Sequence, residues 1–290
     1  MTSTERQTPR GLKRHDVASV VGGSGVPVCP NPIFVIGSPR SGTSVLAWSL
    51  AQHSDMWTSA ESDFLWHLFG QDRFDESFAT TMARTDGSWL SKNDVDRQEL
   101  LSYLGLGFNA LFTSRSEGKR WIDQSPTYTL IADLLADLFP GAFFVHILRD
   151  GRSVVNSMVS SGFSMHWADS FEEACKAWSH FVEVAMQFCE RLPERGLTVR
   201  MDRLSADPNE EFGRLLAWLG AAPEAGPADF FSSNRINSSY GKSERQTRDG
   251  EGVWRAWSSE QRRLFKAHAA PTLLRYGLAD ERELDLALVG

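Results

Sequence analysis

The sequence contains few cysteines, and it has no apolar run long enough to cross a membrane. Its three cysteines do not suggest a disulfide framework, because Cys175 and Cys189 lie in one predicted helix and cannot meet, and Cys29 is the third. A membrane helix needs about 18 consecutive apolar residues, and no such stretch occurs. Residues 1–25 are polar and glycine-rich, without the apolar segment of a secretory signal. We therefore expect a cytoplasmic protein with reduced thiols.

An excess of positive charge and the common metal-binding patterns are absent as well. The net charge is −7, from 30 basic and 37 acidic residues, which argues against a general nucleic-acid-binding protein. No H-E-x-x-H, C-x-x-C or EF-hand pattern occurs, so no metal is expected. The 290 residues, 41% of them hydrophobic, suffice for one large core. We predict a disordered tail over residues 1–30 and a single domain over residues 31–290.

The clearest motif follows the first apolar segment. Ile33 to Ile36 form an apolar run, Gly37 ends it, and a helical pattern starts near Val45. A strand, a glycine-bounded loop and a helix in this order direct backbone N–H groups and a helix N-terminus at one point, where a phosphate can bind. The candidate ligand-binding residues are those of the loop: Ser38, Pro39, Arg40, Ser41, Gly42, Thr43 and Ser44.

This loop has the spacing of a Walker A loop but lacks its lysine. The pattern is G-x-x-x-x-G-T-S, whereas a Walker A loop is G-x-x-x-x-G-K-[ST]. Thr43 stands where the lysine would contact the β- and γ-phosphates, and the basic residue is Arg40, inside the loop. The loop therefore indicates a phosphate ligand other than an ordinary triphosphate. A plain strand–helix turn is the alternative.

A second motif follows the apolar run Phe143 to Leu148. The turn Arg149-Asp150-Gly151-Arg152 comes next, and Ser153 and Ser157 share one face of the helix that follows. Ligands of open α/β sheets bind outside the carboxyl ends of the strands. Arginines and a serine at such a place can bind a second phosphate. A salt-bridged helix start with Asp150 as N-cap explains the same residues equally well.

Together the two motifs resemble those of the sulfotransferases that use 3′-phosphoadenosine 5′-phosphosulfate (PAPS). In that family a P-[KR]-S-G-T loop binds the 5′-phosphosulfate, and R-D-x-R with a later serine binds the 3′-phosphate. The resemblance spans roughly Ile33 to Leu219 and is strongest to the tyrosylprotein-type and related bacterial enzymes of the sulfotransferase-3-like branch. It implies PAPS as donor, 3′-phosphoadenosine 5′-phosphate (PAP) as product, and Arg149 and Ser157 as 3′-phosphate ligands.

The resemblance also implies a catalytic base. The related enzymes place a glutamate 21 residues after the loop arginine, and that position here is Glu61. A carboxylate there could take the proton of an acceptor hydroxyl, while Arg40 offsets the charge on the leaving oxygen. Such sulfuryl transfer requires no metal. The alternative is that Glu61 only caps a helix; His67 is a reserve base, although a helical histidine beside aromatics is more typical of a core.

Three segments depart from the family pattern. Gln124 occupies the place of a lysine that many members carry before a proline, and Met201 replaces an aromatic residue of an R-Y-E-D-L segment. Near the C-terminus, Arg248 to Trp254 loosely matches an R-x-G-x-x-G-x-W loop. That match implies that Arg248 and Gly250 contact the nucleotide as part of a lid; an exposed turn is the alternative.

Alternating apolar strands and amphipathic helices predict an α/β fold: a single domain with a P-loop-like central parallel β-sheet of about five strands, flanked by helices. His146, on a buried strand, and the apolar stripe of residues 168–192 are expected in the core. Strands are expected at 33–37, 56–60, 119–123, 142–148 and 197–201. Helices are expected at 43–53, 62–70, 94–115, 127–138, 152–160, 168–191, 208–219 and 258–276.

The favoured hypothesis is a cytoplasmic, bacterial, PAPS-dependent sulfotransferase that acts on a hydroxyl of a small-molecule, lipid or glycan acceptor. Aromatic residues within 62–118 could line the acceptor pocket, although a helical core explains most of them. One alternative is a P-loop kinase or NTPase, which Thr43 and the basic end of the 143–148 strand disfavour. Another is a catalytically inactive nucleotide-binding protein of the same fold. A homodimer is possible, but no segment demands one.

Overall fold

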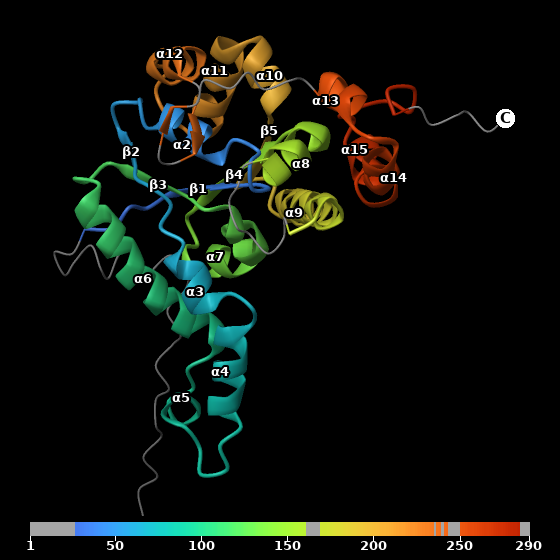
Figure 1. The fold of residues 1–290 in the computed structure, drawn as a ribbon. Coiled ribbons are helices and arrows are strands. Elements are labelled where there is room, and N and C mark those ends of the chain that lie inside the picture. The colour runs from blue at the N-terminus through green and yellow to red at the C-terminus, as the bar shows by residue number, and fades with distance from the viewer. Residues whose placement is uncertain (1–26, 161–168, 235, 239–240, 243–249, 285–290) are drawn as a thin grey trace, which may run out of the picture.

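The computed structural model describes residues 27–160, 169–234, 236–238, 241–242 and 250–284. Five parallel strands form the central sheet in the order β2-β3-β1-β4-β5 (Figure 1). The strands are β1 (Ile33–Ile36), β2 (Met56–Thr58), β3 (Arg120–Gln124), β4 (Phe143–Leu148) and β5 (Gly196–Arg200). All five lie where the sequence predicts them, and the predicted parallel α/β architecture is confirmed.

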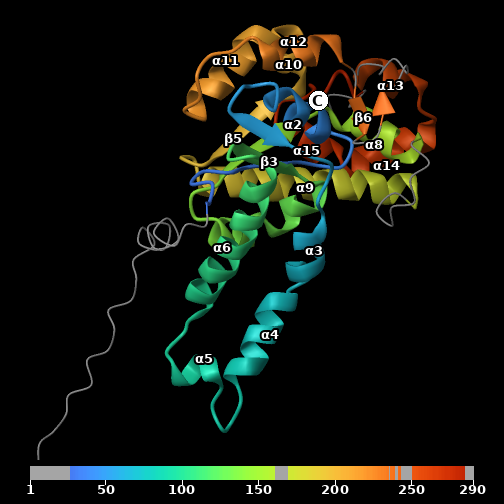
Figure 2. The same cartoon turned by 90° about the vertical axis from the view of Figure 1, so that its left-hand side faces the viewer.

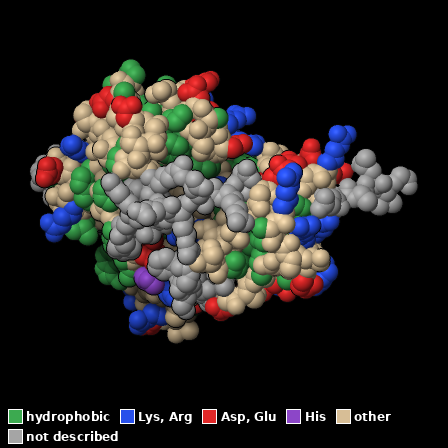
Figure 3. Space-filling model, turned by 45° about the horizontal axis from the view of Figure 1, so that its top comes forward, with side chains coloured by type: hydrophobic (Ala, Val, Ile, Leu, Met, Phe, Trp, Pro, Cys, Tyr) green, Lys and Arg blue, Asp and Glu red, His purple; other side chains and the backbone are tan. Residues whose placement is uncertain are grey.

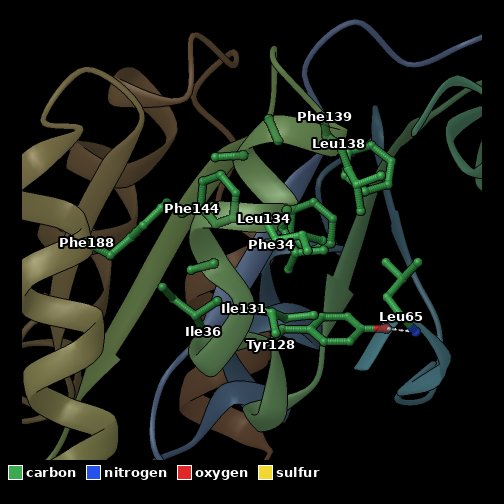
Figure 4. Close-up of a cluster of buried hydrophobic side chains, with 14 of the residues drawn as sticks. Phe34, Ile36, Leu65, Tyr128, Ile131, Leu134, Leu138, Phe139, Phe144 and Phe188 are labelled. Atoms are coloured by element: carbon green, nitrogen blue, oxygen red, sulfur yellow. Dashed lines mark hydrogen bonds between the residues drawn. The ribbon is translucent and has the colours of Figure 1, made fainter. Parts of the chain in front are cut away.

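Helices cover both faces of the sheet, which explains why β1 is apolar throughout. Ile33 and Val35 face α2, α11 and α12, whereas Phe34 and Ile36 face α6, α7 and α9. Figures 1 and 4 show these two layers and the Phe34 side of the core. The helices named here are α2 (Thr43–Leu50), α6 (Arg97–Arg115), α7 (Ala132–Leu138), α9 (Phe171–Arg191), α11 (Pro208–Trp218) and α12 (Gly226–Ser233).

The remaining elements pack around the ends of this sandwich. A third core cluster joins α8 and α9 to the C-terminal helices. A short hairpin, β6 (Ile236–Ser238) with β7 (Gly241–Lys242), is antiparallel. The other elements are α3 (Phe64–Phe69), α4 (Arg73–Met82), α5 (Trp89–Lys92), the 3₁₀ helix η1 (Pro126–Ile131), α8 (Gly151–Ser160), α10 (Met201–Ala206), α13 (Gly250–Ala256), α14 (Ser259–His268) and α15 (Ala270–Arg275).

An arm of helices projects from the domain. Figures 1 and 2 show α4 and α5 beyond the body of the molecule, connected to it through α3 and α6. Neither α4 nor α5 contains a buried residue, and Trp89 in α5 is 70% exposed. The sequence analysis did not predict these two helices.

The predicted helices are confirmed with two exceptions. The segment 258–276 forms two helices, because Pro271 lacks the N–H that a continuous helix needs. The segment 127–138 begins as η1 and becomes α-helical only at Ala132. The helices α10, α12 and α13 were not predicted. His146 and the apolar stripe of α9 are buried as expected.

The domain begins earlier than predicted. Cys29, which the sequence analysis assigned to the tail, is 6% exposed, and its backbone N–H donates to Asn109 Oδ1 and Thr113 Oγ1, both at 2.9 Å. Residues 1–26 lie outside the described residues. All three cysteines are described, buried and free, which agrees with the absence of a disulfide framework.

Candidate functional site

The strand order places the two sequence motifs side by side. β1 pairs with β3 on one side and with β4 on the other, and all three strands are parallel. Their carboxyl ends therefore meet at one edge of the sheet, with the loop after β1 between the ends of β3 and β4. The loop after β2, which contains Glu61, opens at the same edge because β2 is parallel to β3.

The loop after β1, the donor loop (residues 37–44), has left-handed backbone at three positions. The φ angles are 153° at Gly37, 67° at Arg40 and 108° at Gly42. Side chains seldom adopt such angles, so Gly42 is required here and Arg40 is held in a sparsely populated conformation. A Cβ atom at Gly37 would lie 2.9 Å from the carbonyl oxygen of Ile147, so β4 also excludes a larger residue there. Left-handed residues within a turn are typical of loops whose successive backbone N–H groups bind an anion.

The N-terminus of α2 points into this loop. Gly42 is its N-cap, and among the described residues no side chain caps the helix. The Ser38 and Ser41 hydroxyls instead donate to carbonyl groups within the loop, at 3.2 Å and 2.6 Å. Backbone N–H groups at a helix N-terminus that no side chain caps are suited to a phosphate. The predicted roles of Ser38, Pro39, Ser41, Gly42, Thr43 and Ser44 as donor ligands stay predictions.

The structure brings Arg40, Arg149 and Ser157 into one cluster. Arg40 Nε donates to Ser157 Oγ in α8 at 3.1 Å, and Arg149 Nη1 donates to the Arg40 carbonyl oxygen at 3.3 Å. The two residues predicted for the 3′-phosphate thus contact the residue predicted for the 5′-phosphosulfate. The two predicted phosphate sites are neighbours on the same edge of the sheet.

Charge and burial favour the binding of an anion by this cluster. Burial lowers the pKa of Arg40, and the charge of Glu61 opposes that shift. Burial also lowers the pKa of Arg149; Asp150 opposes this shift, and the positive charge of Arg40 adds to it. Two partly desolvated cations that repel each other are stabilised when a polyanion binds between them. The negative charge of Glu61 thus favours the charged form of Arg40.

Arg152 and Asp150 pair with each other at the start of α8. Arg152 is 2% exposed, and its Nη2 donates to Asp150 at 2.7 Å and to Glu283 at 3.0 Å. Asp150 Oδ1 accepts from the Arg152 N–H at 2.8 Å, as an N-cap does. The alternative of a salt-bridged helix start is therefore confirmed for this pair, whereas a contact between Arg152 and the 3′-phosphate stays a prediction.

The two departures from the family pattern both contact the donor loop. Gln124 is fully buried, and its Oε1 accepts from Ser44 Oγ at 3.2 Å. Met201 packs on Gly42 so closely that a Cβ atom there would lie 2.3 Å from Met201 Cε. A neutral amide and a thioether thus stand where the family resemblance would imply a cation and an aromatic ring.

Other predicted residues lie apart from this cluster or outside the described residues. His67 is exposed on α3, so its expected place in the core is wrong. Gly250 begins α13 and is so close to the Asp150 carboxylate that a Cβ atom would lie 2.1 Å from Oδ2, whereas Arg248 lies outside the described residues. Within the described part of the chain, no cluster of three potential metal ligands and no helix that could span a membrane is found.

The sequence analysis missed one group of residues at this edge. The Thr129 hydroxyl accepts from the Gly37 N–H at 2.8 Å and donates to the Gly37 carbonyl at 3.1 Å. Thr129 belongs to the run Asp123-Gln124-Ser125-Pro126-Thr127-Tyr128-Thr129, which begins with the last two residues of β3 and continues beyond the strand. A polar run immediately after a strand, at the edge where the motifs end, is the signal that could have identified it.

The face in Figure 3 has basic and acidic side chains interspersed, without a broad patch of one sign. The positive charge of the cluster described above comes from Arg40 and Arg149, which are partly buried. This local charge fits a small anionic ligand better than an extended polyanion such as nucleic acid.

Comparison with known proteins gives consistent matches. A family model described as "Sulfotransferase family" matches residues 32–224. The protein-tyrosine sulfotransferase of Drosophila melanogaster is 23% identical over 191 residues, which are 64% of this chain and 37% of that protein. Nodulation protein NoeE of Sinorhizobium fredii is 27% identical over 224 residues, which are 68% of this chain and 52% of that protein. The chain thus spans about half the length of the curated relatives that it matches.

Solved structures share the fold. The sulfotransferase domain from the curacin biosynthetic pathway aligns with a TM-score of 0.52 at 19% identity, over 83% of this chain and 98% of that domain. Mouse sulfotransferase SULT7A1, in a complex with PAP, aligns with a TM-score of 0.51 at 11% identity, over 94% and 92% of the two chains.

Proposed function

Because the chain belongs to the sulfotransferase family, we propose that it transfers the sulfuryl group of PAPS to a hydroxyl group of a small-molecule, lipid or glycan acceptor. The observation that carries this proposal is the cluster of Arg40, Arg149 and Ser157 at the uncapped N-terminus of α2, with Glu61 beside Arg40. The reaction needs two anion-binding groups and one carboxylate, and this cluster contains them.

The donor loop is suited to the phosphosulfate end of the nucleotide. Its backbone N–H groups, with the Thr43 and Ser44 hydroxyls, would bind the 5′-phosphate oxygens. Arg149 and Ser157 would bind the 3′-phosphate, which distinguishes PAPS from ATP. The mouse relative in a complex with PAP supports this nucleotide as the ligand. Arg248 and Gly250 remain candidate lid residues in this proposal.

Bound PAPS supplies an electrophilic sulfur, whose bond to the 5′-phosphate oxygen breaks as the acceptor oxygen bonds to it. Glu61 takes the proton of the acceptor hydroxyl, and the oxygen of that hydroxyl attacks the sulfur in line with the leaving group. Arg40 stabilises the negative charge that remains on the phosphate oxygen. Gln124, being neutral, adds hydrogen bonding but no charge, so Arg40 carries most of this electrostatic stabilisation.

Calorimetric titration with PAP, and separately with ATP and Mg²⁺, tests the nucleotide. We expect PAP to bind more tightly, because ATP lacks the phosphate that Arg149 and Ser157 would contact. Tighter binding of ATP would contradict the proposal and favour a triphosphate enzyme with an unusual loop.

A panel of acceptors tests the reaction. PAP release from PAPS would be measured with a phenol, a simple sugar, a long-chain alcohol and, given the names of several relatives, a tyrosine-containing peptide. Turnover with any of them, reduced by orders of magnitude in Glu61→Gln with PAP affinity retained, is the expected result. Binding of PAP without turnover would instead support the catalytically inactive alternative. A cytoplasmic location and a homodimer stay predictions.

A further inference from the structure

Seven consecutive residues, beginning at the carboxyl end of β3, form a segment that contacts two loops of the site. This bridging segment (Asp123–Thr129) is buried apart from Pro126, with exposed fractions from 0% at Tyr128 to 9% at Thr127. Six of its seven side chains can form hydrogen bonds, and such groups are costly to bury unless they are paired. The partners of these side chains therefore show what the segment does.

On one side the bridging segment contacts the donor loop. Gln124 Oε1 accepts from Ser44 Oγ at 3.2 Å, and Thr129 Oγ1 exchanges hydrogen bonds with both backbone groups of Gly37. Both ends of the donor loop are thus attached to this segment.

On the other side the segment contacts the loop that carries Glu61. Ser62 Oγ lies 2.6 Å from Asp123 Oδ2 and 2.6 Å from Tyr128 OH, and the Leu65 N–H donates to Tyr128 OH at 3.3 Å (Figure 4). An ionised carboxylate only accepts, so Ser62 donates to Asp123 and accepts from Tyr128. The result is a directed chain of hydrogen bonds from Leu65 through Tyr128 and Ser62 to Asp123.

The next residue of the Glu61 loop is held as well. Asp63 has a φ of 55°, a left-handed conformation that is unfavourable for most residues. Its N–H donates to Ser125 Oγ at 3.2 Å, and its Oδ1 accepts from Thr127 Oγ1 at 2.7 Å. The two residues that follow Glu61 are therefore both fixed by the bridging segment.

We propose that Asp123, Ser62 and Tyr128 are positioning residues that hold the Glu61 carboxylate in register with Arg40 and the donor loop. The inference rests on the proposed function, because it requires Glu61 to be the base. One short rigid segment sets the position of both loops, so a change at Ser62 displaces the base while the donor loop keeps its contacts to Gln124 and Thr129. Burial raises the pKa of Asp123 to about 6, which leaves it ionised at neutral pH as the terminal acceptor of the chain.

A comparison of Ser62→Ala, Ser62→Thr and Glu61→Gln tests the inference. Ser62→Ala removes both 2.6 Å hydrogen bonds, whereas Ser62→Thr retains the hydroxyl. Ser179→Ala is the matched control, because it removes a partly buried hydroxyl that donates to the His268 carbonyl at 2.8 Å, between α9 and α14. The readouts are kcat with PAPS and the fastest acceptor of the panel, Kd for PAP, and thermal unfolding.

We expect Ser62→Ala to lower kcat by about 10- to 100-fold, as small displacements of catalytic groups do, and to leave Kd for PAP within about twofold. Ser62→Thr should recover most of kcat, and Ser179→Ala should match the wild type. Adding Ser62→Ala to Glu61→Gln should cause no further loss, because the serine acts through the glutamate.

Two kinds of failure can be distinguished. If the wild type shows no turnover, or if Glu61→Gln retains full activity, the proposed function or its base is wrong and the inference is wrong with it. If Glu61→Gln is impaired but Ser62→Ala is fully active, or if the two losses multiply, only the positioning inference is wrong. If Ser62→Ala does not fold, Tyr128→Phe replaces it, because this variant keeps the Ser62–Asp123 hydrogen bond. It is combined with Glu61→Gln in the same way, and the same outcomes decide.

Discussion

Replacement of Arg149 by alanine should weaken PAP binding without unfolding the protein. Hydrogen bonds to charged groups contribute about 1.5–3 kcal/mol, and each 1.4 kcal/mol changes Kd tenfold, so the expected loss is about 10- to 150-fold. The upper part of this range applies if the guanidinium binds the 3′-phosphate through two N–H groups, because Arg149 is largely desolvated. The loss of its 3.3 Å bond to the Arg40 carbonyl should cost only about 0.5–1.5 kcal/mol of stability.

The assay is calorimetric titration of wild type, Arg149→Ala and Arg149→Lys with PAP at one fixed salt concentration. Lysine keeps the charge but not the planar donor pair, so its Kd should lie between the other two. Arg191→Ala is the control, since Arg191 is 53% exposed and pairs with Asp133 on the surface. An unchanged Kd in folded Arg149→Ala would refute the assignment of Arg149 to the nucleotide.

Three further predictions concern buried groups. Burial raises the pKa of Asp123 from 3.8 to about 6, so the free energy of unfolding should fall by at most about 3 kcal/mol as pH rises from about 4 to 6. Urea unfolding of Asp123→Asn should lack this fall. A pH profile of Asp123→Asn identical to that of the wild type would contradict the prediction. Burial lowers the pKa of His146 to about 3, so stability should fall as pH drops below about 6.5; His146→Leu should flatten that slope, and an unchanged slope would count against a neutral buried histidine. Gly42→Ala should abolish PAP binding in calorimetry even when combined with Met201→Ala, because the φ of 108° remains unfavourable after the contact with Met201 is removed. Recovery of binding in the double variant would show that only the contact with Met201 matters.

Much of the fold and the main site motifs could be predicted from the sequence. The strands β1 and β4 are mainly apolar runs buried on both faces, and such runs are visible without any partner information. The donor loop and the Arg149 turn were recognisable because each requires particular residues directly after a strand. Glu61 was found only through spacing in related enzymes.

What the sequence did not reveal depends on contacts between distant segments. The pairing of Arg152 with Glu283, 131 residues away, was not predicted, because no local pattern encodes that distance. The bridging segment looked like an altered lysine motif, because its partners at Gly37, Ser44, Ser62 and Asp63 become neighbours only when β3 pairs with β1 and β2. Helices α4 and α5 were also not predicted, although Phe74 in α4 packs against the core cluster that contains Phe34.

The projecting arm and the donor loop should differ in how well they tolerate changes of sequence. Because α4 and α5 contribute no buried residue, substitutions, insertions or deletions there should alter the free energy of unfolding little. The donor loop has no such latitude, since a methyl group at Gly37 or Gly42 already meets another atom. The arm begins at Arg73, 12 residues after Glu61, so under the proposed function new acceptor preferences could arise by changing the arm while the donor loop is inherited unchanged.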